Sequence, residues 1–193
     1  DAVFQRAGPD MAAVIVEPVP ANYGLLPERR AWLAHLVYRA QQAGALVIFD
    51  EVISGFRTGL TGAAGFYELR PDLVCFGKVI GGGFPVGAYA GRADLMKLVA
   101  PEGPVYQAGT LSANPVGMRA GLATLERMAS VDGWLTLDRR ASSFAAELAR
   151  HLEGIGDGIR VVRHGSIFWI VQGAQHDIRR PDDIPASHAE WFG

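Results

Sequence analysis

A lysine close to three consecutive glycines is the first feature of this sequence that could do chemistry. Lys78 follows the apolar run Leu73–Phe76, and two residues separate it from Gly81–Gly83. Consecutive glycines let a backbone approach another group closely. A lysine amine removed from water can attack a carbonyl and form a Schiff base. The pattern therefore favours a covalent lysine site, although most lysines are plain surface residues.

A glycine-rich nucleotide loop is the competing interpretation of the same segment. A phosphate-binding P-loop requires a glycine five positions before its Gly-Lys pair and Ser or Thr after the lysine. Asp72 and Val79 occupy those two positions. Residues 81–86 also fail the Gly-x-Gly-x-x-Gly pattern of dinucleotide sites. The nucleotide interpretation therefore fails on spacing.

An acidic pair follows a second apolar run. Asp50 and Glu51 come directly after Leu46–Phe49, as in a Walker-B strand, but that match is weak without a P-loop. A buried acid at a strand end can instead keep a pyridinium nitrogen protonated, which makes the ring an electron sink. A helix cap or a buried ion pair remains open as a structural role for Asp50.

Hydroxyl groups gather in a third segment, residues 106–115. Asn114 is the expected N-cap of a long helix, and Pro115 suits the first helical position. Backbone N–H groups and hydroxyls at the start of a helix bind anions, so a phosphate would fit here. Because many helix starts look like this, the segment alone is a modest signal.

The elements that position these residues alternate between strand and helix. A helical apolar pattern lies between Pro27 and Gly44. Buried strands are expected at the short apolar runs, residues 12–16, 45–50, 73–76 and 87–91. This alternation predicts an α/β fold, a mostly parallel sheet with helices on both faces. Asp50 and Lys78 would lie at the carboxyl ends of strands, where such sheets carry their chemistry.

The pattern changes after residue 130. Helices are predicted from Asn114 and over 134–152, and two strands are predicted at 159–162 and 166–172. We therefore expect residues 1–130 to be part of a large domain and residues 131–193 to begin a smaller α+β domain. The chain lacks an initiator Met and ends on apolar residues, so we expect an interior piece of a longer protein.

Composition restricts the class of protein. The 193 residues are 49% hydrophobic with a net charge of -2, which suits a globular protein rather than a nucleic-acid-binding surface. No apolar run approaches bilayer length, and no signal peptide opens the chain. The single cysteine, Cys75, favours a reducing compartment, and we expect a cytoplasmic protein. The histidines show no metal-ligand spacing, so no metal site is expected.

Taken in order, these motifs resemble the class-III aminotransferases, which are pyridoxal-phosphate enzymes. Residues 49–57, 77–88 and 105–112 carry the resemblance, which covers about Ala12 to Leu125 and weakens after Gly165. The segments 49–57 and 105–112 resemble the aminomutases of the family in particular. Transaminases of the family usually have one more glycine in the first segment and a His-Gly variant of the last.

The resemblance implies a fold-type-I transferase and a role for each matching residue. Lys78 would bind the cofactor and transfer protons, Asp50 would pair with the ring nitrogen, and Val52 would pack on one ring face. Thr110, after Gly109, would reach the phosphate of the neighbouring subunit's cofactor, which implies a homodimer.

Two further positions follow from the same resemblance. Asn22, in the segment 17–22, would lie near the phenolic oxygen of the ring. Ala113 stands where the family usually has glycine, and a positive φ there would cost about 1 kcal/mol. The family's own-subunit phosphate cup and ring-stacking aromatic residue would precede Asp1, so this chain alone is expected to bind the cofactor poorly.

For the whole protein, the resemblance implies an intramolecular amino transfer that uses pyridoxal and pyridoxamine phosphate. The expected reaction converts a small amino-aldehyde, glutamate-1-semialdehyde, to 5-aminolevulinate in tetrapyrrole synthesis, with no nucleic-acid or membrane partner. A class-III ω-amino-acid transaminase and a non-catalytic fragment remain as alternatives.

Overall fold

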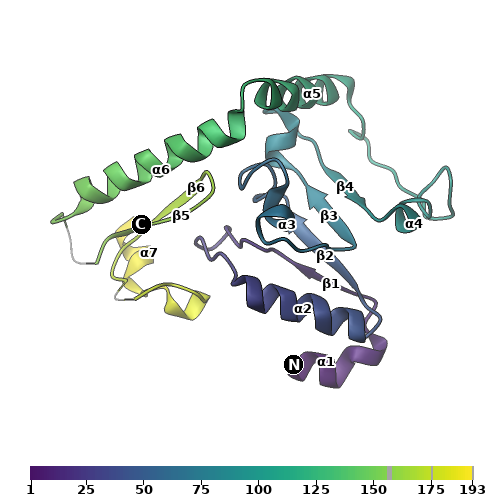
Figure 1. Cartoon of the computed structure of the whole chain (residues 1–193), viewed down its shortest axis with the longest axis horizontal. Coiled ribbons are helices and arrows are strands. Elements are labelled where there is room, and N and C mark those ends of the chain that lie inside the picture. The colour runs from purple at the N-terminus through teal and green to yellow at the C-terminus, as the bar shows by residue number, and fades with distance from the viewer. Residues whose placement is uncertain (156–157, 175, 193) are drawn as a thin grey trace.

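A four-stranded sheet forms the centre of the computed structural model, which describes residues 1–155, 158–174 and 176–192. The strand order is β1-β2-β3-β4 (Figure 1). The strands are β1 (Ala13–Val16), β2 (Leu46–Glu51), β3 (Leu73–Phe76) and β4 (Ala88–Gly91). β1, β2 and β3 run parallel, and β4 joins β3 in the antiparallel sense. The expected α/β fold with a mostly parallel sheet is confirmed, and the edge strand is the reversed one.

Helices and short 3-10 turns connect and cover the strands. They are α1 (Ala2–Ala7), η1 (Gly8–Asp10), α2 (Arg30–Gln42), α3 (Gly62–Phe66), η2 (Lys78–Gly81), α4 (Ala93–Met96), α5 (Pro115–Ser130), α6 (Gly133–Leu152), η3 (Pro181–Asp183) and α7 (Ser187–Phe192). A separate antiparallel hairpin consists of β5 (Arg160–His164) and β6 (Ile167–Val171). These strands and α6 lie within two residues of their predicted positions.

Burial alternates along β2 because successive side chains of a strand point to opposite faces. Val47, Phe49 and Glu51 are buried, whereas the other three residues of the strand are half-buried. Val47 and Phe49 pack with Val37 and Ala40 of α2 in one apolar cluster. α2 therefore covers the face of the sheet to which Glu51 points.

The opposite face of the sheet is more open than predicted. Ile15 of β1 is 64% exposed and Tyr89 of β4 is 43% exposed. In the described residues, α2 packs on one face and no helix covers Ile15. Asp50 and Cys75, which are register partners, lie on the open face.

α2 begins at Arg30 and not at Pro27, where the sequence predicted its start. The backbone N–H of Leu26 donates to the carbonyl of Pro20, 2.9 Å away, so residues 25–29 stay beside the preceding loop. Leu26 itself is buried at 3% exposure. This burial fixes the segment in an extended form that apolar spacing alone does not reveal.

The hairpin β5–β6 contacts the loop that follows β2. Ser166, in the hairpin turn, donates to the carbonyl of Arg57 through its backbone N–H (2.9 Å) and its hydroxyl (3.0 Å). His164 packs edge-on against Phe66, with ring centroids 4.6 Å apart. These contacts connect the last third of the chain to the segment after Asp50.

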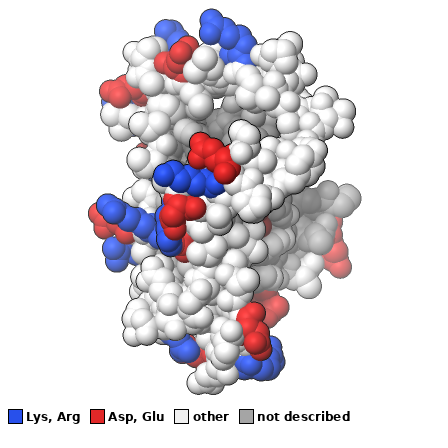
Figure 2. All heavy atoms as spheres, turned by 90° about the vertical axis from the view of Figure 1, so that its right-hand side faces the viewer, with Lys and Arg blue, Asp and Glu red and all other residues white. Residues whose placement is uncertain are grey.

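Charges of both signs are interspersed on the surface. Figure 2 shows the side of the molecule that carries α4 and β4, where acidic and basic groups lie next to one another and no large patch has a single sign. Arg92 accounts for two such contacts, because its guanidinium pairs with Asp72 and Asp94. Among the helices that the structure describes, none is both long and apolar enough to cross a membrane.

Candidate active site

Asp50 lies near the carboxyl end of β2, where the backbone orients its carboxylate. The Oδ1 atom accepts a hydrogen bond from the backbone N–H of Val52 at 3.0 Å. Within the described part of the chain, no other hydrogen bond to this carboxylate forms. Burial raises the pKa of the neighbouring Cys75 thiol, and the charge of Asp50 raises it further. Asp50 is therefore a half-buried acceptor with an oxygen available to a ligand.

Lys78 starts the turn η2 just after β3, beside the end of β2. Its φ of 46° lies in the left-handed region, which is unusual for a residue with a side chain and marks local strain. The residue is exposed, and the sequence-based expectation of a desolvated lysine is therefore wrong for this chain alone. The position at the strand end agrees with the prediction.

Val52 and Gly77 join the two strand ends. A Cβ atom at Gly77 would lie 3.1 Å from Cγ1 of Val52, so glycine permits this close approach. Val52 also donates its N–H to Asp50, as described above. The structure thus brings together three of the predicted site residues, Asp50, Val52 and Lys78, at the carboxyl edge of the sheet.

The helix α5 supports the turn that carries Lys78. A Cβ at Gly121 would lie 2.1 Å from the carbonyl oxygen of Ile80, and a Cβ at Gly82 would lie 2.4 Å from Oγ1 of Thr124. The two segments therefore pack backbone against backbone. Gly82 also has φ 59°, a conformation that glycine adopts without strain. The glycines after Lys78 thus let the chain turn beneath α5.

The hydroxyl segment precedes α5 as predicted. Asn114 caps the helix through its Oδ1 atom, which accepts from the N–H groups of Val116 (3.0 Å) and Gly117 (3.2 Å). Thr110 and Gly109 lie in the exposed turn before it. Ala113 has φ 55°, so the position does require the left-handed backbone that glycine favours.

A cavity of about 450 Å³ connects this segment to the glycine-rich one. Gly109 and Ser112 line it on one side, and Pro85, Val86 and Gly87 line it on the other. The backbone around Thr110 therefore lies next to the chain that leaves the Lys78 turn. Asn22 is different, because it lies in the exposed loop after β1 and does not line this cavity.

Glu51 is a site residue that the motif argument did not assign. It is 1% exposed, and its carboxylate accepts hydrogen bonds from Ala63, Ala64 and Ser54. The acidic pair Asp50-Glu51 was the only signal in the sequence, and it does not say which acid faces the interior. The alternation of burial along β2 separates the two roles.

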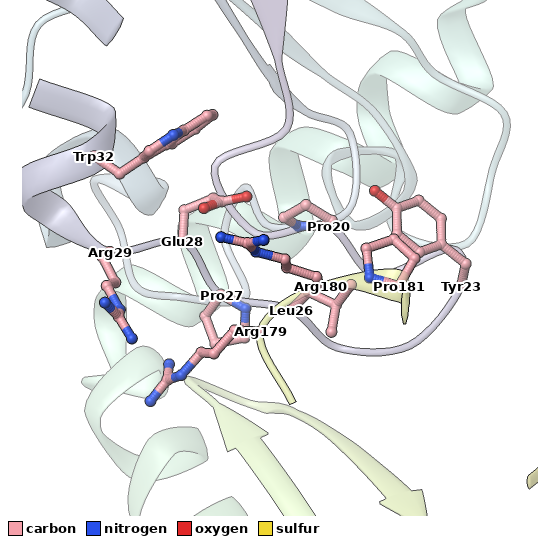
Figure 3. A pocket seen from close by; sticks show the side chains of 10 residues that line it. All are labelled: Pro20, Tyr23, Leu26, Pro27, Glu28, Arg29, Trp32, Arg179, Arg180 and Pro181. Carbon is pink, nitrogen blue, oxygen red and sulfur yellow. The ribbon is translucent and has the colours of Figure 1, made fainter. Parts of the chain in front are cut away.

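A second cavity, of about 370 Å³, lies away from these residues, between residues 20–32 and 179–181 (Figure 3). The side chains of Glu28 and Arg180 both reach into it, and the indole of Trp32 lies at one side. Burial raises the pKa of Glu28. None of the residues assigned from the motifs lines this cavity. Among the described residues, no group of three or more His, Cys, Asp or Glu could hold a metal ion.

Comparison with known proteins gives a consistent family. Residues 1–178 match the family model described as aminotransferase class-III. The chain is 52% identical over 190 residues to a glutamate-1-semialdehyde 2,1-aminomutase of Bdellovibrio bacteriovorus, covering 98% of this chain and 45% of that protein. The same name and identity apply to a relative from Leptospira interrogans, of which 43% is covered. The chain therefore spans less than half the length of these curated relatives.

Solved structures with the same fold include transaminases and an aminomutase. A β-phenylalanine aminotransferase from Variovorax paradoxus superposes with a TM-score of 0.87 at 35% identity, over 96% of this chain and 43% of that one. A glutamate-1-semialdehyde aminomutase from Pseudomonas aeruginosa, in complex with PMP, superposes at 0.78 with 26% identity, over 92% and 41%.

Proposed function

Because this chain belongs to the class-III aminotransferase family, we propose that the whole protein is a pyridoxal-phosphate enzyme that converts glutamate-1-semialdehyde to 5-aminolevulinate. The observation that carries the reaction type is the 52% identity, over nearly the whole chain, to proteins named for that aminomutase activity. Tetrapyrrole synthesis is the process in which such a reaction belongs.

The residues at the strand ends fit this cofactor. The Asp50 carboxylate, which Val52 orients, has an oxygen that can accept the N–H of a pyridinium ring. The amine of Lys78, on the next strand end, would hold the cofactor covalently and would move the proton at the substrate carbon that bears the amine. Val52 would pack on one ring face. When bound, the cofactor supplies an electron sink for charge that develops on that carbon.

The phosphate and the phenolic oxygen of the cofactor would be held by the remaining predicted residues. We propose that Thr110, with the backbone at Gly109, contacts the phosphate in the neighbouring subunit, and that Asn22 lies near the phenolic oxygen. The exposure of Thr110, Asn22 and Lys78 in this chain supports a site that other polypeptide completes.

A homodimer is the assembly that this arrangement requires. Large apolar side chains are exposed next to Thr110 and along the start of α5, namely Tyr106 (82% exposed), Leu111 (62%) and Val116 (56%). Exposed apolar side chains that cluster in this way are typical of an interaction surface. We propose that a second subunit covers them, and that a large domain ends near residue 130. The single cysteine supports a cytoplasmic location.

The test of the reaction uses the full-length protein and one substrate. Substrate and product are isomers, so a mutase consumes no external amino donor or acceptor. Substoichiometric enzyme should convert glutamate-1-semialdehyde completely to 5-aminolevulinate without added amino acid or keto acid. Turnover that stalls after one equivalent and resumes only with a keto acid would show a transaminase instead.

A class-III ω-amino-acid transaminase is the second candidate, and one observation favours it. The β-phenylalanine aminotransferase is more similar to this chain, at 35% identity, than the P. aeruginosa aminomutase is, at 26%. The same experiment separates the candidates, because only a transaminase must release a keto product and admit a second substrate.

The lysine assignment has a test of its own. Borohydride reduction of the pyridoxal-phosphate-loaded protein, followed by peptide mapping, should place the pyridoxyl group on Lys78. The other lysine of this chain, Lys97, is exposed on the surface after α4 and serves as the internal control. Label on Lys97, or on neither lysine, would contradict the assignment.

A further inference from the structure

Glu51 is a buried carboxylate next to the residue that we assign to the cofactor ring. Its side chain points to the face of the sheet that α2 covers, whereas Asp50 points to the other face. Burying a charge is unfavourable unless hydrogen bonds replace the lost water. Three such bonds are present, and they show what Glu51 holds in place.

All three donors come from the segment that follows β2. The Oε2 atom accepts from the N–H of Ala63 at 2.6 Å and from the hydroxyl of Ser54 at 3.2 Å, and Oε1 accepts from the N–H of Ala64 at 3.0 Å. Gly62 lies so close that its Cβ would be 2.5 Å from Oε2, and its φ is 60°. Glu51 therefore ties residues 54–64 back onto the strand end.

The same segment begins with the groups that shape the cofactor site. Val52, directly after Glu51, donates the N–H that orients Asp50 and lies against Gly77, beside Lys78. The carbonyl of Ser54 accepts the N–H groups of Arg57 at 3.0 Å and Thr58 at 3.1 Å, which closes the turn. A shift of this turn would move Val52 and hence the carboxylate of Asp50.

We propose that Glu51 is a positioning residue for the proposed reaction: its buried carboxylate fixes the turn after β2, so that Asp50 and Val52 are presented to the cofactor ring. The inference rests on the proposed function. It differs from a purely structural role as the cap of α3, because a cap would affect stability without acting through Asp50.

The experiment uses Glu51→Gln in the full-length protein. Glutamine keeps the volume and one acceptor oxygen, but its NH2 group would face a backbone N–H. We expect a folded protein in which pyridoxal phosphate binds at least about tenfold more weakly and kcat falls by roughly ten- to a hundredfold. The pH dependence of the visible absorbance of the bound cofactor should change in the same direction in Glu51→Gln as in Asp50→Asn, measured alongside. Glu147→Gln, at an exposed position on α6, is the matched control and should match the wild type.

A double variant decides between positioning and a structural cap. If Glu51 acts through Asp50, adding Glu51→Gln to Asp50→Asn should lower kcat and cofactor affinity by less than about threefold more, because the two effects are coupled. Losses that multiply, or a Glu51→Gln protein that is less stable but has normal cofactor affinity and pH profile, would overturn the inference.

Three further outcomes are informative. If Glu51→Gln does not fold, Ser54→Ala removes only one of the three bonds and should show smaller changes of the same kind, whereas an unchanged cofactor affinity and pH profile would overturn the inference. If the wild-type protein binds pyridoxal phosphate but proves to be a transaminase, the reaction proposal fails and the role of Glu51 is still measured through cofactor binding. If the wild type binds no pyridoxal phosphate, both proposals fall.

Discussion

At the level of single residues, His164 is a buried imidazole that, within the described structure, lacks a partner for one ring nitrogen. It is 8% exposed, and its Nε2 atom has no hydrogen-bond partner among the described residues. The pKa of His164 is lowered from 6.5 to about 4, chiefly by burial and also by the charge of Arg163, whereas Asp138 opposes the shift. The neutral imidazole packs against Phe66 and Tyr67, so this contact depends on the absence of a charge.

The first prediction concerns acid stability. The unfolded chain binds a proton at His164 near pH 6.5 and the folded chain only near pH 4, so stability falls as the pH drops through this window. Between pH 7 and pH 5 we expect His164 to contribute a loss of about 2 kcal/mol in the free energy of unfolding. Urea unfolding at both pH values measures it. His164→Leu should lack this part of the loss, whereas His151→Gln, at an exposed site, should retain it. Equal losses in wild type and His164→Leu would contradict the prediction.

Sequence reasoning located the residues of the candidate site better than it described their surroundings. The positions of Asp50, Lys78 and Asn114 at the ends of elements were predicted because strong apolar patterns mark those elements. The role of Glu51 could not be predicted, since it depends on N–H groups twelve and thirteen residues away. The exposure of Lys78 was not predicted, because the sequence shows which residues adjoin the lysine along the chain but not whether other segments bury it.

At the level of elements, the packing of α5 on η2 determines where Lys78 stands. A Cβ at Gly121 would meet a backbone carbonyl of the turn, whereas a Cβ at Gly117, one helical turn earlier, would lie 3.1 Å from a methyl group of Val86 and at ordinary contact distance from Phe84 and Pro85. A side-chain methyl group can move aside more easily than a backbone carbonyl in a supported turn. An added methyl group should therefore cost more stability at Gly121 than at Gly117.

The second prediction uses this pair. Gly121→Ala should lower the free energy of unfolding by about 1–3 kcal/mol through overpacking, although alanine favours the helix by about 1 kcal/mol. It should also weaken pyridoxal-phosphate binding, because Lys78 begins the displaced turn. Gly117→Ala should be nearly neutral in both respects. Urea unfolding and cofactor titration of the full-length protein measure these effects, and a Gly121→Ala protein as stable as Gly117→Ala would disprove the argument.

The helix boundaries show why element prediction succeeds unevenly. The start of α5 was predicted to the residue because Asn114 and Pro115 act locally. The start of α2 was displaced by three residues because the bond from Leu26 to Pro20 belongs to a neighbouring loop. Local signals are visible in a sequence, whereas contacts between loops are not.

At the level of the whole molecule, the proposed site takes Lys78 from one subunit and Thr110 from the other. The third prediction tests this arrangement. It uses purified mixed dimers of the full-length protein that contain two substitutions, Lys78→Ala and Thr110→Val. When Lys78→Ala and Thr110→Val lie on different chains, one site keeps both wild-type residues. That dimer should keep about half of the wild-type activity per dimer.

When both substitutions lie on the same chain, the site that keeps Lys78 is completed by the partner chain that carries Thr110→Val. That dimer should bind pyridoxal phosphate roughly tenfold more weakly, as expected for the loss of a hydrogen bond to a charged group. The opposite ranking of the two dimers would assign Thr110 to its own subunit. A Thr110→Val homodimer with unchanged cofactor affinity would remove Thr110 from the phosphate site.

The hairpin turn at Ser166 has a consequence for anyone who dissects this protein. The sequence suggests a cut at residues 131–133, where the helical pattern breaks. Such a cut would remove α6 and the hairpin, take both Ser166 hydrogen bonds away from Arg57, and remove the His164 ring that packs against Phe66. A shortened protein would therefore carry a loosened loop only a few residues from Asp50. A boundary chosen from helix periodicity is a poor place to divide a gene for expression, because hydrogen bonds distant from the cut in the sequence connect the two parts.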